Sequence, residues 1–344
     1  MDVSTSNRLW WIDSIKALCM IGVYLCHTEV YYYSADSWSL GYWMKPFYVN
    51  AFFFVSGYLF FGKWLKNNVL MKTRGGYLIA LQNVFFRLIF PTLIFSTLIY
   101  FPKTIFQGVN GQLTHYFFHV WGGISFWFTS ALVVAQLILL SLVFLLKKKM
   151  IWVYLGVCAL LFVLGLILNN LRLSNDAVCF FPWFYQTGLE YTFVMAIGGL
   201  YKQYEEKIDF FLNPFTLVSF ILYVVILGGA WRYQIELHML GLGGRLNLIG
   251  TVVILCGIIV LVGLCKRLAP SQWFSFAGKN SIVLYFFSGV IPAMLGAIAH
   301  RLIDDSYLVT LFLTILGIVC GSVAAFIVKS YLPFMVDLRI LIKK

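Results

Sequence analysis

The chain has 344 residues, of which 61% are hydrophobic and only 11% are charged. Soluble domains average about 25% charged residues, so these few charges could not cover the surface of a soluble fold. Disorder is excluded as well, because the many aromatic side chains need burial. The net charge of +12 does not indicate nucleic-acid binding, since lysine and arginine collect in the cytoplasmic loops of multi-pass membrane proteins. The composition predicts an all-α integral membrane protein.

Ten apolar segments are long enough to cross a bilayer, which takes about 20 residues. They run from about residue 13 to 32, 46 to 62, 80 to 101, 125 to 146, 150 to 169, 182 to 201, 212 to 231, 246 to 265, 278 to 299 and 307 to 329. We therefore expect a bundle of about ten transmembrane helices. It forms a single domain over residues 1–344, with no appended soluble domain.

The distribution of basic residues predicts the orientation of this bundle. With the N-terminus inside and an even number of crossings, most of the 25 lysines and arginines fall in cytoplasmic segments. The outside segments hold Lys45, Lys103, Arg172, Arg232, Arg245 and Arg301. This asymmetry places both termini in the cytoplasm. The inside clusters also fit contact with anionic lipid headgroups.

Other features of the chain favour simple interpretations. Asp13 and Lys16 interrupt the first apolar run, so we expect the first helix to be retained and not cleaved as a signal peptide. The seven cysteines lie mostly inside apolar runs and form no Cys-x-x-Cys pair, which is typical of small buried hydrophobic residues. His115 and His119 lie four residues apart outside, but no Cys, Asp or Glu is near them, so no metal site is predicted.

Ionisable side chains inside a span are the strongest functional leads, because each costs about 2.5–3.5 kcal/mol on insertion scales. In the first span, Lys16 and His27 are separated by three helical turns plus about 20°, or about 16 Å of rise. Asp13, Met20 and Val23 complete a stripe at steps of three and four. Such a stripe faces protein or a water-filled cavity. The alternative is that Lys16 snorkels to the surface beside Asp13 and His27 only bonds a neighbouring helix.

Two charged residues in other spans also need an explanation. Arg87 lies four residues before Pro91, which lacks the N–H that would bond the Arg87 carbonyl. We expect a kink there and an anion site near the cytoplasmic face, with an ordinary positive-inside arginine as an equal alternative. Glu190 lies at membrane depth beside Tyr191. It either orients a catalytic base, binds acceptor hydroxyls or pairs with a basic group.

Several motifs, in order along the chain, resemble a known family. Lys16, ten intervening residues and His27 resemble the Arg/Lys-x10-His motif in the first helix of the membrane-bound acyltransferase-3 family, the bacterial O-acyltransferases of surface glycans. Residues 52–59 (FFFVSGYL) resemble its Phe-rich Ser-Gly-Tyr segment, and the Trp-Phe pair at 127–128 and residues 278–285 (GKNSIVLY) resemble two more of its motifs. The motif residues carried over are Ser56, Tyr58, Trp127, Asn280, Ser281 and Tyr285.

The chain departs from the family pattern at two positions. The family commonly has a basic pair at the start of the third span; here Arg87 matches the second member but Val84 occupies the first. Lys72 and Arg74, expected in the preceding loop, are candidate substitutes. Many members also carry a histidine shortly after the ninth-span tyrosine, where this chain has Ser288 after two phenylalanines. A second catalytic histidine at that place is therefore excluded.

The resemblance implies transfer of an acyl group, most often acetyl, from cytoplasmic acyl-CoA to a hydroxyl of a surface or lipid-linked carbohydrate. Histidine suits the role of general base because an unperturbed imidazole has a pKa of about 6.5, so His27 takes that role, with Glu190 as its candidate partner. Lys16 is too far along the helix to share the proton transfer. Together with Arg87, Arg74 and Asp13 it is assigned to binding of the acyl donor, whose phosphates suit lysine and arginine.

The main alternative is a proton-coupled transporter or an exporter of a glycolipid or small molecule. A buried lysine, aspartate, histidine and glutamate also suit a proton relay, but no pair of broken helices is visible in corresponding halves of the sequence. The expected partners are a carbohydrate or lipid-linked glycan, membrane lipids and, in one version, a separate extracytoplasmic transferase. No nucleic acid is expected. A monomer and a homodimer are both left open.

Overall fold

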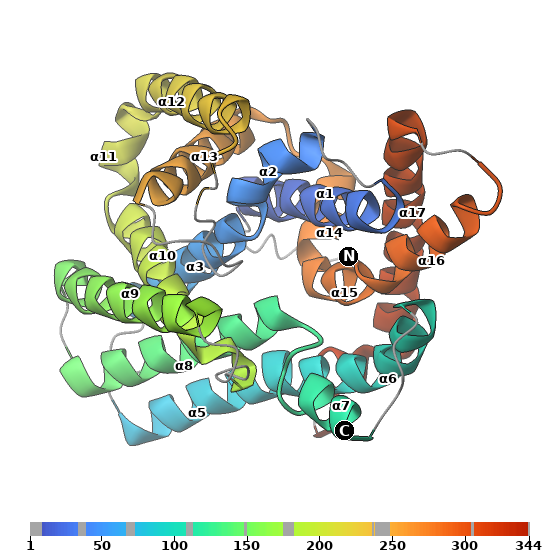
Figure 1. The fold of residues 1–344 in the computed structure, drawn as a ribbon. Coiled ribbons are helices and arrows are strands. Elements are labelled where there is room, and N and C mark those ends of the chain that lie inside the picture. The colour runs from blue at the N-terminus through green and yellow to red at the C-terminus, as the bar shows by residue number, and fades with distance from the viewer. Residues whose placement is uncertain are drawn as a thin grey trace.

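The structure is a computed structural model that describes residues 9–33, 39–66, 73–107, 113–147, 150–174, 182–235, 237, 248–303 and 306–342. Within these ranges the chain forms helices and no strands (Figure 1). The N-terminal half contains α1 (Trp10–Tyr32), α2 (Leu40–Tyr48), α3 (Asn50–Lys66), α5 (Arg74–Val84), the π-helical turn η1 (Phe85–Ile89), α6 (Phe90–Gln107), α7 (Leu113–Val120), α8 (Trp127–Leu146) and α9 (Ile151–Ser174). The C-terminal half contains the 3-10 turn η2 (Pro182–Phe184), α10 (Tyr185–Gln203), α11 (Glu205–Phe210), α12 (Leu212–Arg232), α13 (Leu248–Arg267), α14 (Gln272–Lys279), α15 (Ser281–Phe287), α16 (Val290–Ala299), α17 (Tyr307–Tyr331), the 3-10 turn η3 (Pro333–Met335) and α18 (Arg339–Ile342).

Six helices in the described ranges are long and apolar enough to cross a membrane, and a seventh span results if the bent pair α15 and α16 counts as one. The expected number was about ten. The helices α1 and α10 have the necessary length, at 23 and 19 residues, but polar and ionisable side chains interrupt their apolar surface. The helix α3 has only 17 residues. The all-helical fold is confirmed, and the chain is a multi-pass membrane protein.

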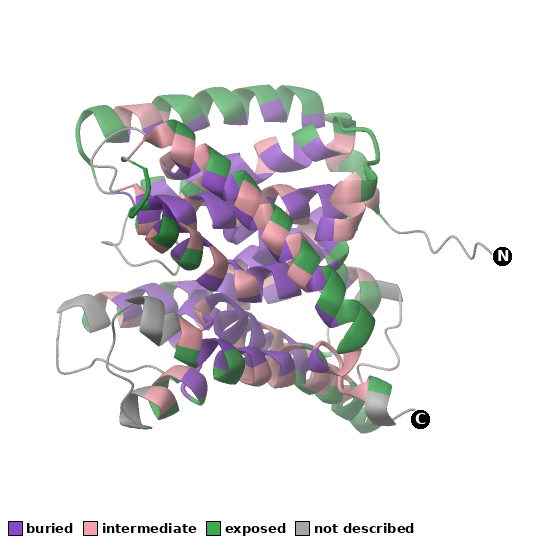
Figure 2. Cartoon of the chain, turned by 90° about the vertical axis from the view of Figure 1, so that its right-hand side faces the viewer, coloured by how far each residue is buried: buried purple, intermediate pink, exposed green. Residues whose placement is uncertain are grey.

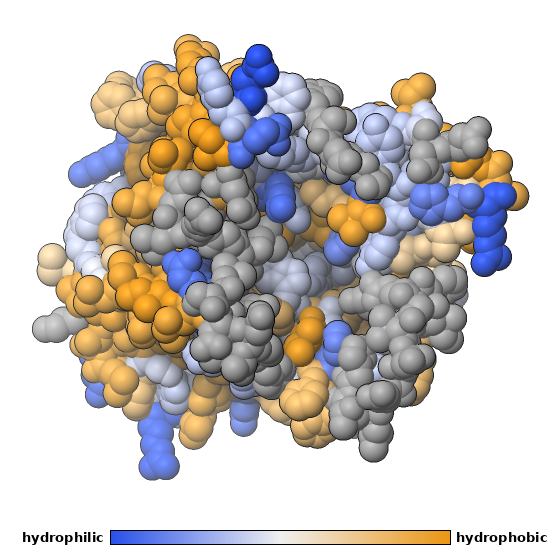
Figure 3. Space-filling view, viewed as in Figure 1, coloured by the Kyte–Doolittle hydropathy of each residue, from blue (hydrophilic) through white to orange (hydrophobic). Residues whose placement is uncertain are grey.

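The outer helices expose apolar side chains that no other helix of the described residues covers. Helix α12 exposes Phe215, Leu217, Val218, Phe220, Ile221 and Val225. Figure 2 shows exposed residues along the outer helices and buried residues between them. In the space-filling view, apolar side chains gather along the left side of this face (Figure 3). Such an apolar exterior fits hydrocarbon and not water.

Two helices are central to the packing. Helix α10 packs mainly against α9, α3 and α8, and α1 packs against α14, α2, α16, α17 and α13. Glycines allow the closest of these approaches: a Cβ atom at Gly57 of α3 would lie 1.9 Å from the carbonyl oxygen of Met195 in α10, and one at Gly198 would lie 2.1 Å from that of Phe54. The Ser-Gly-Tyr segment therefore lies where the backbones of α3 and α10 meet.

Two expected spans, the second and the third, begin at different residues in the structure. The second begins at Asn50 and not at residue 46, because the shorter helix α2 precedes it and the Asn50 amide donates to the carbonyl oxygen of Pro46 at 2.6 Å. The third begins at Arg74, where the Thr73 hydroxyl accepts the N–H of Gly76 at 3.1 Å. The sequence predicted that Arg74 lies in a loop. The structure corrects this prediction, because Arg74 is the first residue of α5.

The expected kink before Pro91 takes the form of a π-helical turn. The N–H of Phe90 donates to the carbonyl oxygen of Phe85, five residues earlier, and the span from Arg74 to Pro102 continues through it. Proline removes one helical hydrogen bond, and a π turn is a common local adjustment in such helices. Arg87 lies in the middle of this turn.

The ninth expected span, residues 278 to 299, is not one helix. It is divided at Asn280 and again at Ser288 and Gly289, where α15 and α16 meet at an angle of 41°. The Ser288 hydroxyl bonds the carbonyl oxygen of Tyr285 at 2.7 Å, and Pro292 in α16 has no N–H to bond Ser288. The break brings Tyr285 to the end of α15, beside the start of α8.

Contacts between helix ends support the predicted alternation of the spans. The Trp11 ring lies 5.1 Å from the ring of Tyr58 and 6.2 Å from that of Tyr201, and the Lys266 ammonium lies 4.9 Å from the Trp11 ring centre. The start of α1 and the ends of α3, α10 and α13, all assigned to the inside by the charge pattern, therefore share one end of the bundle. Which end faces the cytoplasm stays the prediction of that pattern.

The close packing of α3 on α10 gives a stability prediction. We expect Gly57→Ala to lower the free energy of unfolding by about 1–3 kcal/mol, because the added methyl group overlaps the Met195 carbonyl and forces the helices apart. The matched control is Gly156→Ala in α9, where a Cβ atom meets nothing within 4 Å. The control should be neutral or stabilising by up to about 1 kcal/mol. Thermal unfolding of the detergent-purified proteins measures both, and equal melting temperatures would contradict this account.

Candidate active site

His27 lines a cavity of about 640 Å³ at one end of α1. Trp127, the first residue of α8, and Tyr285 of α15 line the same cavity. These three motif residues are separated by about 100 residues or more in the sequence, and the fold brings them to one space. The remaining polar side chains of the lining are those of Cys26, Glu29, Tyr33, Ser39, Tyr42, Lys45 and Tyr48.

The aromatic residues of this cavity are held by the packing around them. The His27 ring is stacked against Tyr31, one helical turn later, at 6.1 Å with an interplanar angle of 13°. The Tyr285 hydroxyl accepts the N–H of Phe128 at 3.3 Å, and the two rings are 5.0 Å apart in an edge-to-face arrangement. Because that bond uses an acceptor position, the hydroxyl proton of Tyr285 remains available to a molecule in the cavity.

Glu29 is a cavity residue that the sequence analysis did not identify. Its carboxylate accepts the Ser39 hydroxyl at 3.1 Å, the Gly41 N–H at 3.0 Å and the Tyr307 hydroxyl at 2.9 Å. It is only 8% exposed. The side chain thus connects α1 to the N-terminal end of α2 and to α17, and it shapes the wall of the cavity beside His27. The sequence did contain a signal for Glu29, since it is an acidic residue inside the first expected span.

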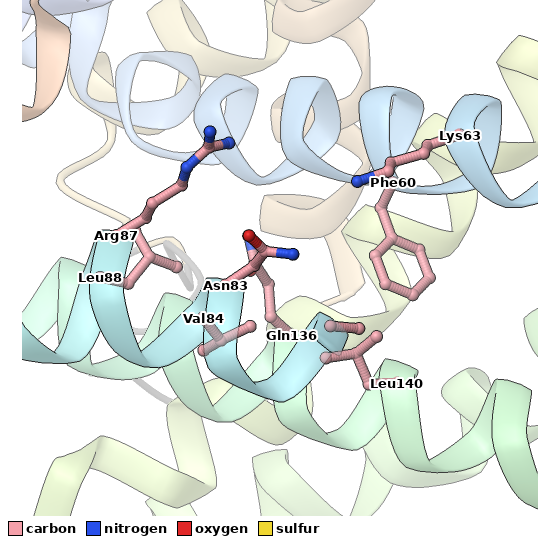
Figure 4. A pocket seen from close by; sticks show the side chains of 9 residues that line it. Phe60, Lys63, Asn83, Val84, Arg87, Leu88, Gln136 and Leu140 are labelled. Carbon is pink, nitrogen blue, oxygen red and sulfur yellow. The ribbon is translucent and has the colours of Figure 1, made fainter. Parts of the chain in front are cut away.

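Arg87 lines a second, separate pocket of about 260 Å³. Lys63 of α3, Asn83 of α5 and Gln136 of α8 line it with apolar neighbours. Figure 4 shows the Asn83 amide and the Arg87 guanidinium, four residues apart on one continuous helical segment, and the Lys63 ammonium of α3 pointing into the same space. The charge pattern counts Lys63 among the cytoplasmic basic residues, and in the structure it belongs to α3. Two cations and an amide around one pocket are suited to an anion.

The other predicted donor-binding residues lie elsewhere. Lys16 is half-buried in α1 and lines neither the His27 cavity nor the Arg87 pocket. Asp13 is 3% exposed, and its backbone lies against α14, where a Cβ atom at Gly278 would come within 2.5 Å of the Asp13 Cα atom. Arg74 is exposed at the start of α5 and does not line the pocket. The structure does not bring these three side chains together with Arg87.

Tyr58 belongs to an ionic cluster between α3, α10, α11 and α13. Its hydroxyl donates to Glu205 at 2.6 Å and accepts from Lys202 at 2.9 Å. Lys266 bonds both Glu205, at 3.0 Å, and Asp209, at 2.5 Å. Burial acts to raise the pKa of Glu205, but the bonds from Lys202, Tyr58 and Lys266 outweigh it and hold that pKa below its usual value. The tyrosine of the motif thus joins helix ends and does not line the His27 cavity.

Glu190 is fully buried in α10 and accepts a hydrogen bond from the Asn169 amide of α9. It does not line the His27 cavity. The neighbouring Gln186 and Thr187 are also completely buried, and their side-chain polar atoms have no hydrogen-bond partner among the described residues. The structure therefore places Glu190 in a polar group of α9 and α10, outside the lining of the cavity that holds His27.

The remaining motif residues have identifiable structural roles. Asn280 lies between α14 and α15, is 4% exposed, and its amide donates to the carbonyl oxygen of Phe276 at 2.9 Å. Ser281 is the first residue of α15, and Ser56 is half-buried in α3. Asn280 and Ser281 define the break that orients the helix carrying Tyr285. In the part of the chain that the structure describes, no group of three or more His, Cys, Asp or Glu residues could hold a metal ion.

A family model described as an acyltransferase domain, Acyl_transf_3, matches residues 9–331, nearly the whole chain. The chain belongs to the acyltransferase-3 family. The resemblance carried by the motifs is thereby confirmed, and the protein is a membrane acyltransferase. Searches of curated proteins and of solved structures found no match.

The contacts of Glu29 give a second stability prediction. Glu29→Ala leaves the Gly41 N–H and two hydroxyl groups without their acceptor, so we expect a loss of about 1–3 kcal/mol in the free energy of unfolding. Glu29→Gln, which keeps one acceptor oxygen, should lose less. The control, Glu206→Ala, removes an exposed carboxylate of α11 and should change stability by at most about 0.5 kcal/mol. If thermal unfolding in detergent gives the same midpoint for the alanine variants, Glu29 does not hold the cavity wall.

Proposed function

We propose that this acyltransferase transfers an acyl group, most often acetyl, from cytoplasmic acyl-CoA to a hydroxyl of a surface or lipid-linked carbohydrate at a bacterial inner membrane. One observation carries the proposal: His27, Trp127 and Tyr285, three motif residues from distant segments, line one polar cavity in a chain of the acyltransferase-3 family. The cavity holds an imidazole for proton transfer, a hydroxyl donor and aromatic surface for a sugar ring.

His27 acts as the general base in this proposal. Its imidazole takes the proton of the acceptor hydroxyl as the oxygen attacks the thioester carbonyl. The carbon–oxygen bond forms, the tetrahedral intermediate expels the thiolate of coenzyme A, and the imidazolium returns the proton to that sulfur. The Tyr285 hydroxyl, whose proton is not used in its bond with Phe128, stabilises the negative charge on the carbonyl oxygen.

The donor enters from the predicted cytoplasmic end. Arg87 binds its phosphates, since arginine suits phosphate oxygens. The extended pantetheine arm spans the distance between the phosphates and the thioester beside His27. Lys16 has no part in this step, because it lines neither the Arg87 pocket nor the His27 cavity. The acceptor approaches His27 from the opposite end. Coenzyme A therefore stays on its own side of the membrane, and the acyl group alone crosses.

Replacement of His27 tests the catalytic part of the proposal. We expect His27→Ala to lower acceptor-dependent release of coenzyme A from acetyl-CoA by about 100-fold or more, because a general base contributes about 10²–10⁴ in rate. The assay uses purified protein in detergent and a thiol reagent. His119→Ala, which removes a histidine outside the cavity lining, should keep normal activity.

Two results would count against the enzyme. Normal coenzyme A release by His27→Ala would remove the general base from the mechanism. No release by the wild-type protein in detergent, with solute flux in sealed vesicles instead, would favour a transporter, because transfer between soluble substrates needs no sealed compartment.

A further inference from the structure

The segment that follows the last long helix, residues 333–342, comprises η3 and α18 and is called the strap below. Met335 of the strap is 7% exposed and belongs to the main hydrophobic core, and Phe334 and Val336 pack against that core. The strap contacts α6 and α17. It is therefore fixed to the body of the bundle beside the helix that carries Arg87.

We infer that the strap builds an anion-binding site at the Arg87 pocket, in which Lys63, Arg87 and Asn83 bind the phosphates of the acyl donor and Asp337 and Arg339 are positioning residues. The inference rests on the proposed function and adds to it a place for the donor's phosphates. Lys63, Asn83 and the two strap residues have no role in the family motifs described above.

Arg339 and Asp337 form a forked ion pair at the edge of this pocket. The Arg339 Nε donates to Asp337 Oδ1 at 2.7 Å, and the Arg339 Nη2 donates to Asp337 Oδ2. The third nitrogen, Nη1, donates to the side-chain oxygen of Asn83. Planar forked pairs fix orientation as well as charge. Each of the three guanidinium nitrogens of Arg339 thus donates to a protein acceptor, and Arg339 holds Asp337 and Asn83 in place.

The fork in turn holds Arg87. Asp337 Oδ2 accepts from the Arg87 Nε at 3.3 Å, which is the inner nitrogen of that guanidinium. Hydrogen bonds from Arg339 and, to a smaller extent, the bond from Arg87 lower the pKa of Asp337 to about 2, so the carboxylate is ionised at neutral pH. The Arg87 side chain is 63% exposed, and its terminal nitrogens extend into the open space of the pocket (Figure 4).

Arg339 of the strap donates hydrogen bonds to acceptor oxygens beside the pocket, so the N–H groups that line the pocket are left to bind a ligand. The Asp337 carboxylate and the Asn83 oxygen both receive bonds from Arg339. The amide nitrogen of Asn83 points into the pocket together with the Lys63 ammonium and the end of Arg87 (Figure 4). A ligand that fits these groups carries negative charge and several acceptor oxygens, which is the chemistry of a phosphate or pyrophosphate. We assign it to the soluble donor and not to a lipid headgroup, because the proposed transfer supplies a phosphate-bearing substrate from this end.

The test measures binding of coenzyme A to the full-length protein in detergent, and the steady-state kinetics with acetyl-CoA. We expect Arg339→Gln to raise the dissociation constant of coenzyme A and the KM for acetyl-CoA by about tenfold, with kcat unchanged. Arg339→Lys should be equally impaired, since it keeps the charge but not the fork. Asp337→Asn should also weaken binding, although it makes the site more positive.

The matched control is Arg267→Gln. Arg267 also donates to an asparagine oxygen, that of Asn213, at 2.5 Å, and it lies at the end of α13. This substitution removes the same charge and the same type of bond outside the pocket, so binding of coenzyme A should be unchanged. A second control is the donor acetyl-pantetheine, which lacks phosphates. Its rate should be the same in wild-type protein and in the strap variants, and this result also shows that the variants are folded.

Several outcomes would overturn the inference. Unchanged binding by Arg339→Gln, or tighter binding by Asp337→Asn, would show that the strap does not position the ligands. Binding of phosphatidylglycerol in nanodiscs that Arg339→Gln weakens, together with coenzyme A binding that the same substitution leaves unchanged, would assign the pocket to a lipid headgroup. In each case the enzyme still releases coenzyme A. Failure of the proposed function looks different, because the wild-type protein then neither binds coenzyme A nor releases it.

Discussion

The first helix cannot lie against lipid, and the rest of the architecture follows from that constraint. Its spanning surface carries Asp13, Lys16, His27 and Glu29, and each such side chain costs about 2.5–3.5 kcal/mol at the centre of a bilayer. The chain surrounds α1 with α2, α13, α14, α16 and α17. Glycines permit this enclosure at the tightest points: a Cβ atom at Gly321 of α17 would lie 2.1 Å from the Tyr24 hydroxyl. More apolar helices such as α12 are left to face the hydrocarbon.

Enclosure of α1 leaves the His27 cavity open because the surrounding elements are short or broken there. Helix α2 ends after nine residues, and the α15–α16 pair bends by 41°. Straight helices would have packed their side chains onto His27, whereas these interruptions leave open space beside it. The breaks are themselves made by polar groups and proline: the Ser39 cap of α2, the Ser288 hydroxyl and Pro292. Local departures from regular helix thus position the candidate site.

The sequence predicted the long apolar helices well and the interrupted ones less well. For α9 and α13 the apolar run alone decides the boundaries, and they agree within a few residues at most ends. At the division at Asn280, by contrast, the Asn280 amide donates to the carbonyl oxygen of Phe276, and α14 on one side of the break packs against α1. Glu190 was predicted to assist His27 because a carboxylate in a span is rare, yet the carboxylate that lines the cavity with His27 is that of Glu29. Two residues of helix rotate a side chain by about 200°, so the predicted stripe contains His27 and Val23, which line the cavity, but leaves out Glu29. Residues of α2 line the cavity beside both His27 and Glu29.

The strap shows a different limit of sequence reasoning. Asp337 and Arg339 follow the last span and read there as ordinary charged residues near a helix end. Their role depends on hydrogen bonds with Asn83 and Arg87, which lie about 250 positions earlier in the sequence. They also lie beyond residue 331, where the family match ends. The family match therefore accounts for His27, Trp127 and Tyr285 but not for the strap. The cavity around the histidine and the pocket around Arg87 are two separate spaces, and a donor that uses both must be long, with its anionic end in one and its reactive end in the other.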